Sequence, residues 1–157
     1  MDEHRAFADL DGRVALVTGC GSPDGIGFAT ARLLGRQGAK VAITSTTERI
    51  QERVAELGDE GITASGHVAD LTDPEEAARV VAETVEIHGG LDILVNNAGV
   101  AINGLLMRFK DDAWAKTLAT NLSGAFYCAR ASASLLLKAK ERGRIINITS
   151  VVGEMGN

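Results

Sequence analysis

The chain has 157 residues, of which 45% are hydrophobic, and a formal net charge of −5. This balance is typical of one globular domain with a buried core, and it argues against nucleic acid or an anionic membrane as a partner. Residues 1–5 are polar and begin no secretory signal, and no apolar run approaches the roughly 20 residues of a membrane span. We therefore predict a cytoplasmic protein in which Cys20 and Cys128 are free thiols. The three histidines show no metal-ligand spacing, so we predict no metal site.

Strand-like and helix-like patterns alternate along the chain. In order they predict a strand (14–18), a helix (25–37), a strand (40–44), a helix (about 48–57), a strand within 63–69, a helix from 73, a strand (91–95), a helix from 111 or 112 to about 140, and a strand (144–149). The first helix is expected to bury a stripe of Ile26, Ala29, Leu33 and Leu34. The third helix is expected to bury Ala77, Val80, Val81 and Val85, with Asp73 as its cap and Pro74 in its first turn.

The strands over 14–18, 91–95 and 144–149 are nearly continuous apolar runs, as expected for strands covered on both faces of a parallel sheet. Five strands joined by helices predict an α/β fold, a Rossmann-like doubly wound parallel sheet with strand order 3-2-1-4-5. We expect one dinucleotide-binding domain over residues 1–157 that is incomplete at its C-terminal end.

A glycine-rich turn over residues 18–27 joins the first strand to the first helix. Glycines let the backbone approach a pyrophosphate closely, and the helix N-terminus offers free N–H groups to the same anion. The turn departs from the strict dinucleotide pattern, because Asp24 stands where the third glycine would be. A purely structural turn therefore stays open as an alternative.

Further polar residues follow the other strands: Asp70, Asn97 and Ser150, with Asn121 in the long helix. Ligands of open α/β sheets bind beyond the carboxyl ends of the strands, so these residues are expected to meet in one crevice. Taken singly, they also fit ordinary roles as a helix cap, a turn residue, a strand-end hydroxyl and a surface amide.

The chain combines the glycine turn with Asp70-Leu71, Asn96-Asn97-Ala98-Gly99, Asn121 and Ser150. With these motifs in this order, the sequence resembles the classical short-chain dehydrogenase/reductase family. Residues 104–108 and 143–153 look most like bacterial 3-oxoacyl-acyl-carrier-protein reductases. The resemblance implies catalytic roles for Ser150, which would bind the substrate carbonyl, and Asn121, which would hold a proton-relay water. It also implies cofactor contacts at Gly19, Ser22, Gly25, Ile26, Gly27, Asp70, Leu71, Asn97, Ala98 and Gly99.

The family's proton donor, a tyrosine four residues before a lysine and after the serine, has no counterpart here. The only tyrosine, Tyr127, precedes Ser150, and Ala131 lies four residues after it. We interpret the chain as part of an oxidoreductase and expect the 157 residues alone to be inactive. A non-enzymatic nucleotide-binding or interaction protein is the alternative. The set Asn97, Asn121 and Ser150 argues against a methyltransferase or flavodoxin-like domain.

NADP is predicted over NAD. An acidic residue about 20 positions after the turn would select NAD, but residues 44–47 are small hydroxyl side chains, with Arg49 nearby. Thr46 and Arg49 are the expected partners of a 2′-phosphate, although the acid Asp24 opposes phosphate binding.

The expected substrate is a small or acyl-carrier-bound carbonyl compound. A homo-oligomer is predicted through the long helix from Asp112, whose apolar residues are Trp114, Leu118, Leu122 and Phe126. The last strand is expected to form an open sheet edge that exposes Ile145, Ile146 and Ile148.

Overall fold

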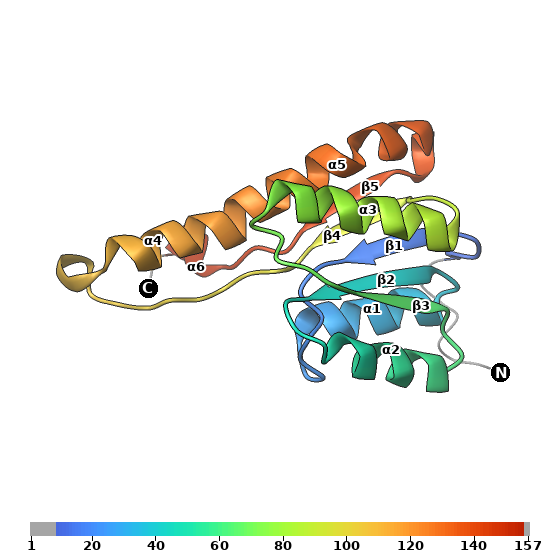
Figure 1. The fold of residues 1–157 in the computed structure, drawn as a ribbon, viewed down its shortest axis with the longest axis horizontal. Coiled ribbons are helices and arrows are strands. Elements are labelled where there is room, and N and C mark those ends of the chain that lie inside the picture. The colour runs from blue at the N-terminus through green and yellow to red at the C-terminus, as the bar shows by residue number, and fades with distance from the viewer. Residues whose placement is uncertain (1–8, 156–157) are drawn as a thin grey trace.

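A computed structural model describes residues 9–155 as one parallel sheet flanked by helices (Figure 1). The strand order is β3-β2-β1-β4-β5, which confirms the predicted fold class and order. The strands are β1 (Val14–Val17), β2 (Lys40–Ser45), β3 (Ala64–Val68), β4 (Ile93–Asn96) and β5 (Arg144–Asn147). The helices are α1 (Ile26–Arg36), α2 (Ile50–Asp59), α3 (Pro74–His88), α4 (Asp111–Leu118), α5 (Gly124–Lys138) and α6 (Val152–Met155).

The sheet has a hydrophobic core on each face. Helices α1 and α2 cover one face and α3 and α5 the other (Figure 1). Because neighbouring strand residues point to opposite faces, Val17 of β1 joins Phe28 in the first core, while Leu16 joins Val80 in the second. The four residues of β1 and of β4 are all buried, as the apolar runs predict.

Helix α1 buries a different face from the predicted one. Ile26 and Leu33 are 66% and 58% exposed, whereas Gly27, Phe28 and Ala31 are buried. The helix is rotated so that Gly27 rests against the carbonyl oxygen of Gly19, where any side chain would collide. That contact turns Phe28 into the core and turns Ile26, Ala29 and Leu33 outward, while Leu34, as predicted, packs against the core.

Helix α3 begins as predicted. Asp73 Oδ1 accepts a hydrogen bond of 2.8 Å from the backbone N–H of Glu75, and Pro74 lies in the first turn. Of the predicted face, Val85 is only half-buried, and Thr84 is buried in its place because its hydroxyl donates to the Val80 carbonyl at 2.8 Å.

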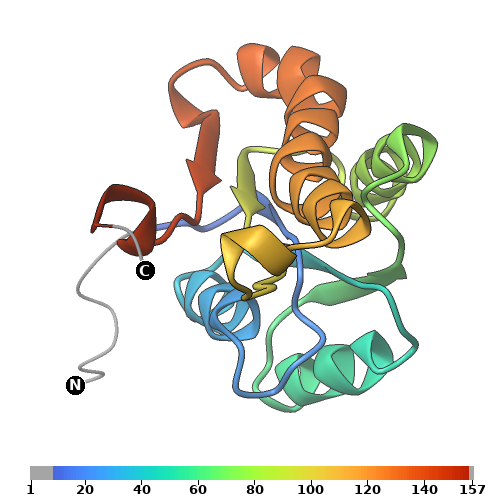
Figure 2. The same cartoon turned by 90° about the vertical axis from the view of Figure 1, so that its left-hand side faces the viewer.

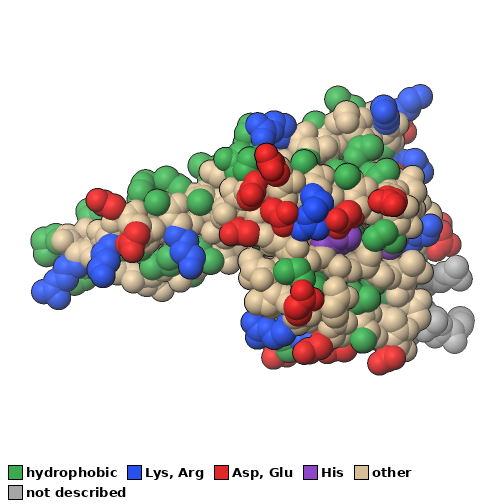
Figure 3. All heavy atoms as spheres, viewed as in Figure 1, with side chains coloured by type: hydrophobic (Ala, Val, Ile, Leu, Met, Phe, Trp, Pro, Cys, Tyr) green, Lys and Arg blue, Asp and Glu red, His purple; other side chains and the backbone are tan. Residues whose placement is uncertain are grey.

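The predicted long helix is interrupted. A π-helical turn over Ala119–Ser123 separates α4 from α5, and the α4 end extends beyond the sheet as an arm (Figures 1 and 2). Trp114, Leu118, Leu122 and Phe126 are exposed along this segment. Figure 3 shows hydrophobic side chains gathered on the arm.

Strand β5 is an open edge, as predicted. All four of its residues are exposed, and Ile145 and Ile146 are 46% and 44% accessible. The segment after Ser150 contains the short helix α6, which the sequence patterns did not predict. None of the helices within residues 9–155 combines the length and apolar content that crossing a bilayer requires.

Candidate functional site

The glycine turn is built so tightly that side chains cannot replace its hydrogens. Gly19 has a φ of +72°, and a Cβ there would lie 2.7 Å from the Cα of Ala98. A Cβ on Gly27 would collide with the Asn97 amide and lie 2.8 Å from the Gly19 carbonyl oxygen. Glycine at both positions therefore lets the turn pack directly against itself and against the loop after β4.

Thr18 and Asn97 tie the turn to the end of β4. Thr18 Oγ1 accepts hydrogen bonds of 2.9 Å from the N–H groups of Asn97 and Ala98. The Asn97 amide donates in return to the carbonyl oxygens of Thr18 and Gly19, at 2.8 and 3.1 Å. The role of Asn97 seen here is to fix the two strand ends together.

The N-terminus of α1 opens beyond this turn. Gly25 is its N-cap, no side chain caps its first N–H groups, and no acidic residue lies in the first turn. Those N–H groups and the helix dipole favour an anion at this end. Ser22 and Asp24 are exposed in the turn before the helix.

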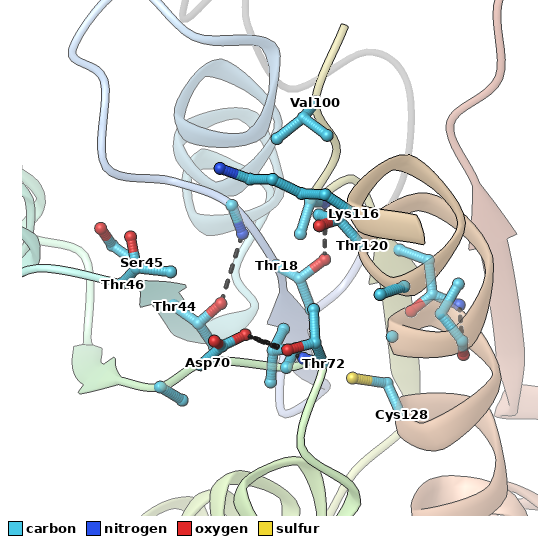
Figure 4. A pocket seen from close by; sticks show the side chains of 18 residues that line it. Thr18, Thr44, Ser45, Thr46, Asp70, Thr72, Val100, Lys116, Thr120 and Cys128 are labelled. Atoms are coloured by element: carbon cyan, nitrogen blue, oxygen red, sulfur yellow. Dashed lines mark hydrogen bonds between the residues drawn. The ribbon is translucent and has the colours of Figure 1, made fainter. Parts of the chain in front are cut away.

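A pocket of about 520 Å³ lies beyond the carboxyl ends of the strands (Figure 4). Of the predicted site residues, Gly19, Thr46, Asp70, Leu71 and Ala98 line it. The other lining residues are Thr18, Thr44, Ser45, Ala69, Thr72, Asn96, Val100, Lys116, Ala119, Thr120, Gly124, Ala125 and Cys128. Residues far apart in the sequence thus converge where the chain topology predicts.

One wall of the pocket consists of hydroxyl groups at the end of β2 and just after it. Thr44 Oγ1 accepts from the Gly19 N–H at 3.3 Å, so the second strand supports the glycine turn. Ser45 Oγ accepts from the Thr47 N–H at 3.2 Å, and Arg49 Nε donates to Thr47 Oγ1 at 3.4 Å. Arg49 is thereby held beside the hydroxyl groups, although it does not line the pocket itself.

Asp70 stands on another side of the pocket. Its Oδ1 accepts from the backbone N–H of Thr72 at 3.0 Å and from the Thr72 hydroxyl at 2.7 Å. Its other carboxylate oxygen accepts no hydrogen bond within the part of the chain that the structure describes. A donor on a ligand in the pocket would find this oxygen available.

The two predicted catalytic residues lie outside the pocket lining. Asn121 sits in the π-helical turn, where its Oδ1 accepts from the Val100 N–H at 2.8 Å and its Nδ2 donates to the Val100 carbonyl at 2.9 Å. Ser150 is exposed after β5, and its Oγ accepts from the Val152 N–H at 3.4 Å. Ser22, Gly25, Ile26, Gly27, Asn97 and Gly99 also lie outside the lining, in the turn and in the loop after β4.

Six lining residues on the helical segment were missed from the sequence: Lys116, Ala119, Thr120, Gly124, Ala125 and Cys128. Their spacings of three to five residues place them on one side of the segment, and this periodicity was the available signal. Burial raises the pKa of Cys128 to about 11 and the pKa of Cys20 to about 12. A hydrogen bond with the Thr44 backbone lowers the pKa of Cys20, but the effect of burial is larger. Both are free, buried and un-ionised thiols at neutral pH.

Tyr127 lies on α5 outside the pocket lining. Its ring packs edge to face with Phe126, with centroids 5.8 Å apart, and the Arg130 guanidinium lies 5.3 Å from its centroid. The side chain contacts the core between α3 and the sheet. Tyr127 therefore has a packing role in this structure.

The chain matches the short chain dehydrogenase family model over residues 13–157. It belongs to that family. Among curated members it is 45% identical to the 3-oxoacyl-acyl-carrier-protein reductase FabG of Vibrio cholerae and 42% identical to the enzyme of that name from Escherichia coli. Each match covers 95% of this chain and 59% of the relative, so the chain spans about three-fifths of these family members. A short chain dehydrogenase structure from Mycobacterium smegmatis superposes with a TM-score of 0.88 at 34% identity, covering 94% of this chain and 62% of that one.

Proposed function

We propose that the chain forms the cofactor-binding part of an NADP-dependent oxidoreductase that interconverts a carbonyl and an alcohol. The observation that carries the proposal is the 520 Å³ pocket at the strand ends, which the tightly packed glycine turn borders at Gly19. The similarity to FabG relatives supports a 3-oxoacyl thioester on an acyl carrier as the substrate class. The buried free thiols of Cys20 and Cys128 support a reducing, cytoplasmic setting.

The residues present fit the adenosine and pyrophosphate parts of a nicotinamide dinucleotide. The N–H groups at the start of α1 would bind the pyrophosphate, since neither a cap nor an acidic side chain in the first turn competes for them. Asp70 and Leu71 would border the adenine, and the loop from Asn97 to Gly99 would line the rest of the cofactor. The bound cofactor supplies the hydride.

We assign the selection of NADP over NAD to the hydroxyl groups at the end of β2 and just after it. Thr46 is exposed and lines the pocket, and Arg49 is held nearby by Thr47. A hydroxyl and a guanidinium both donate to phosphate, whereas an NAD enzyme would place a carboxylate here.

Calorimetric titration with adenosine 2′,5′-bisphosphate and with AMP tests this assignment. The parent chain should bind the bisphosphate more tightly, and Thr46→Asp should reverse that preference by placing an anion against the 2′ position. Thr63→Asp, which adds the same charge at an exposed position before β3 and outside the pocket lining, is the matched control. Equal affinities in the parent, or tighter binding of AMP, would reject NADP.

Ser150 and Asn121 are the proposed catalytic residues. Reduction of a carbonyl leaves an oxyanion that needs a proton from a positioned acid. The hydroxyl group of Ser150 can donate a hydrogen bond to that oxygen, but it is too weak an acid to supply the proton. The side-chain amide of Asn121 already forms hydrogen bonds with both the N–H and the carbonyl group of Val100. Asn121 would therefore orient a water indirectly, through the Val100 backbone.

We expect the 157-residue chain alone to turn over no ketone at a useful rate. A positioned acid contributes roughly 10²–10⁴-fold in rate, and the only tyrosine, Tyr127, is packed against Phe126. The measurement is NADPH oxidation with an acetoacetyl thioester. Steady consumption by the purified chain that Ser150→Ala leaves unchanged would refute both the expectation and the role of Ser150.

The same segment that lines the pocket carries the proposed oligomer surface. Trp114, Leu118, Leu122 and Phe126 are exposed and spaced four apart, so they form one apolar line along α4 and α5. Apolar area of this kind is usually covered by a partner. A second copy of the chain is the proposed partner, and Leu122→Lys should lower the mass measured by sedimentation.

A further inference from the structure

Among the described residues that line the pocket, Lys116 is the one lysine or arginine. It projects from α4, and Figure 4 shows its side chain extending away from the helix and over the pocket. No residue within 9–155 forms a hydrogen bond or ion pair with its ammonium group. A cation that faces a cavity without a partner is available to a ligand.

The surroundings of Lys116 favour an anion carried by that ligand. The pocket's carboxylate, Asp70, is engaged by Thr72 through one oxygen and forms no ion pair with Lys116. The remaining polar lining consists largely of hydroxyl groups, among them Thr44, Ser45 and Thr120, which also donate to anions. A compact ammonium beside several hydroxyl groups is a donor set that suits phosphate.

The position of Lys116 on its helix fixes this orientation. It lies four residues before Thr120, which also lines the pocket, so both occupy the same side of the segment. Lys110, at the N-cap of the same helix, lies outside the lining. The arm therefore presents one of its lysines to the pocket and leaves the other outside it.

We infer that Lys116 is a specificity-determining residue that binds a phosphate group on the adenosine half of the ligand. The inference rests on the proposed nucleotide site and adds to it a charged contact from the helical side of the pocket, across from Thr46. The phosphate is either the one on the ribose 2′ oxygen or the one on the 5′ oxygen, and the two are separated by experiment.

The test titrates the whole chain with adenosine 2′-monophosphate, adenosine 5′-monophosphate and adenosine by calorimetry. Lys116→Gln should weaken binding of the monophosphate it contacts about tenfold, the usual scale of a charge-assisted hydrogen bond. Adenosine should bind the variant and the parent equally. Lys116→Arg should restore the phosphate preference, and Lys110→Gln, which removes the same charge outside the pocket, should leave all three affinities unchanged.

Salt provides a second readout. Between about 0.05 and 0.5 M NaCl the parent should lose phosphate affinity more steeply than Lys116→Gln, because screening weakens an exposed ion pair.

A loss confined to the 2′ or to the 5′ compound supports the inference and identifies the phosphate. Unchanged monophosphate binding in Lys116→Gln, or an equal loss for adenosine, overturns it while leaving the nucleotide site intact. If the parent binds none of the three compounds, the proposed function fails and this inference fails with it.

Discussion

The two edge strands of the sheet, β3 and β5, differ in how far other elements cover them. At the β3 edge, Ser65 and His67 are buried beneath α3, and the Gln51 side chain of α2 donates to the Gly66 carbonyl at 3.3 Å. At the β5 edge every residue is exposed, with apolar Ile145 and Ile146 on opposite faces of the strand. An edge whose free backbone groups are occupied by side chains resists pairing, whereas an open apolar edge invites it.

The β3 edge, called the closed edge below, is stabilised by a chain of hydrogen bonds. The Glu83 carboxylate accepts from His67 Nδ1 at 2.8 Å, so His67 Nε2 accepts from the Ser65 hydroxyl at 3.0 Å. Ser65 Oγ in turn accepts from His88 Nε2 at 2.8 Å. Polar residues can occupy this edge because each has a partner. Edges are closed by the elements packed on them: α2 and α3 both pack on β3, whereas α5 contacts β5 but leaves all four of its residues exposed.

Truncating the same residue type on a covered strand and on the open edge should give the largest contrast. Ile43→Ala on β2, fully buried, should lower the free energy of unfolding by about 2–5 kcal/mol. Ile146→Ala on β5, 44% exposed, should lower it by about 1 kcal/mol or less. Urea denaturation of both variants measures this, and equal losses would mean that β5 is covered in solution.

Removing the central hydroxyl of the closed edge should have the next largest effect. Ser65→Ala leaves the facing nitrogens of His67 and His88 buried without their shared partner, at a cost of about 1–3 kcal/mol. Ser134→Ala, an exposed serine on α5, is the control and should be neutral. If both variants unfold at the same urea concentration, the network does not stabilise this edge.

The closed edge should also make stability depend on pH. Burial, the Lys40 charge and His67 hold the pKa of His88 below its usual 6.5, so the folded state binds fewer protons than the unfolded state as pH falls below that value. The contribution is fully present above about pH 6.5 and is lost as pH falls through the lower folded-state pKa. Hydrogen bonds from Arg79 and His67 lower the pKa of Glu83, so its contribution is lost at still lower pH.

Unfolding free energies at several pH values between neutral and mildly acidic test this dependence. His88→Gln should flatten the upper part of the profile, while the lower part, which belongs to Glu83, remains. Parallel profiles for the parent and His88→Gln would contradict the assignment to His88.

Charging the open edge should change stability least and association most visibly. Ile146→Lys should alter the unfolding free energy by about 0.5 kcal/mol or less, because the side chain is half exposed. It should reduce self-association in sedimentation experiments, since an edge lysine blocks strand pairing. Thr63→Lys, exposed just before β3, should not affect association. Equal masses for the parent and Ile146→Lys would show that β5 is not a contact.

Local patterns were sufficient to predict the strands and the cap at Asp73, because these depend on residues close in sequence. The strand order followed from the rule that crossovers between parallel strands are right-handed. They failed for the rotation of α1, which is decided by the contact of Gly27 with Gly19 and Asn97 across the fold. Hydrophobic periodicity gave Ile26 and Leu33 as buried, and a second face with Phe28 fits the sequence as well.

The candidate site shows the same division. The residues at strand ends, such as Gly19, Asp70 and Ala98, could be placed in the pocket from topology alone. Lys116 could not, since its spacing from the other lining residues gives its side of the segment but does not say whether that side faces solvent or a cavity. The π-helical turn was also invisible, because a single wide turn barely changes the apolar pattern.

That wide turn has a geometric consequence for the arm. A step of four residues overshoots a full α-helical turn by about 40°, so a line of residues spaced by four drifts around a regular helix. The π-helical turn, with its longer i→i+5 repeat, offsets this drift midway. One rod can then keep two straight lines of side chains, Lys116 to Cys128 toward the pocket and Trp114 to Phe126 away from it. Deleting one residue here would rotate α5 by about 100° against α4 and put both lines out of phase.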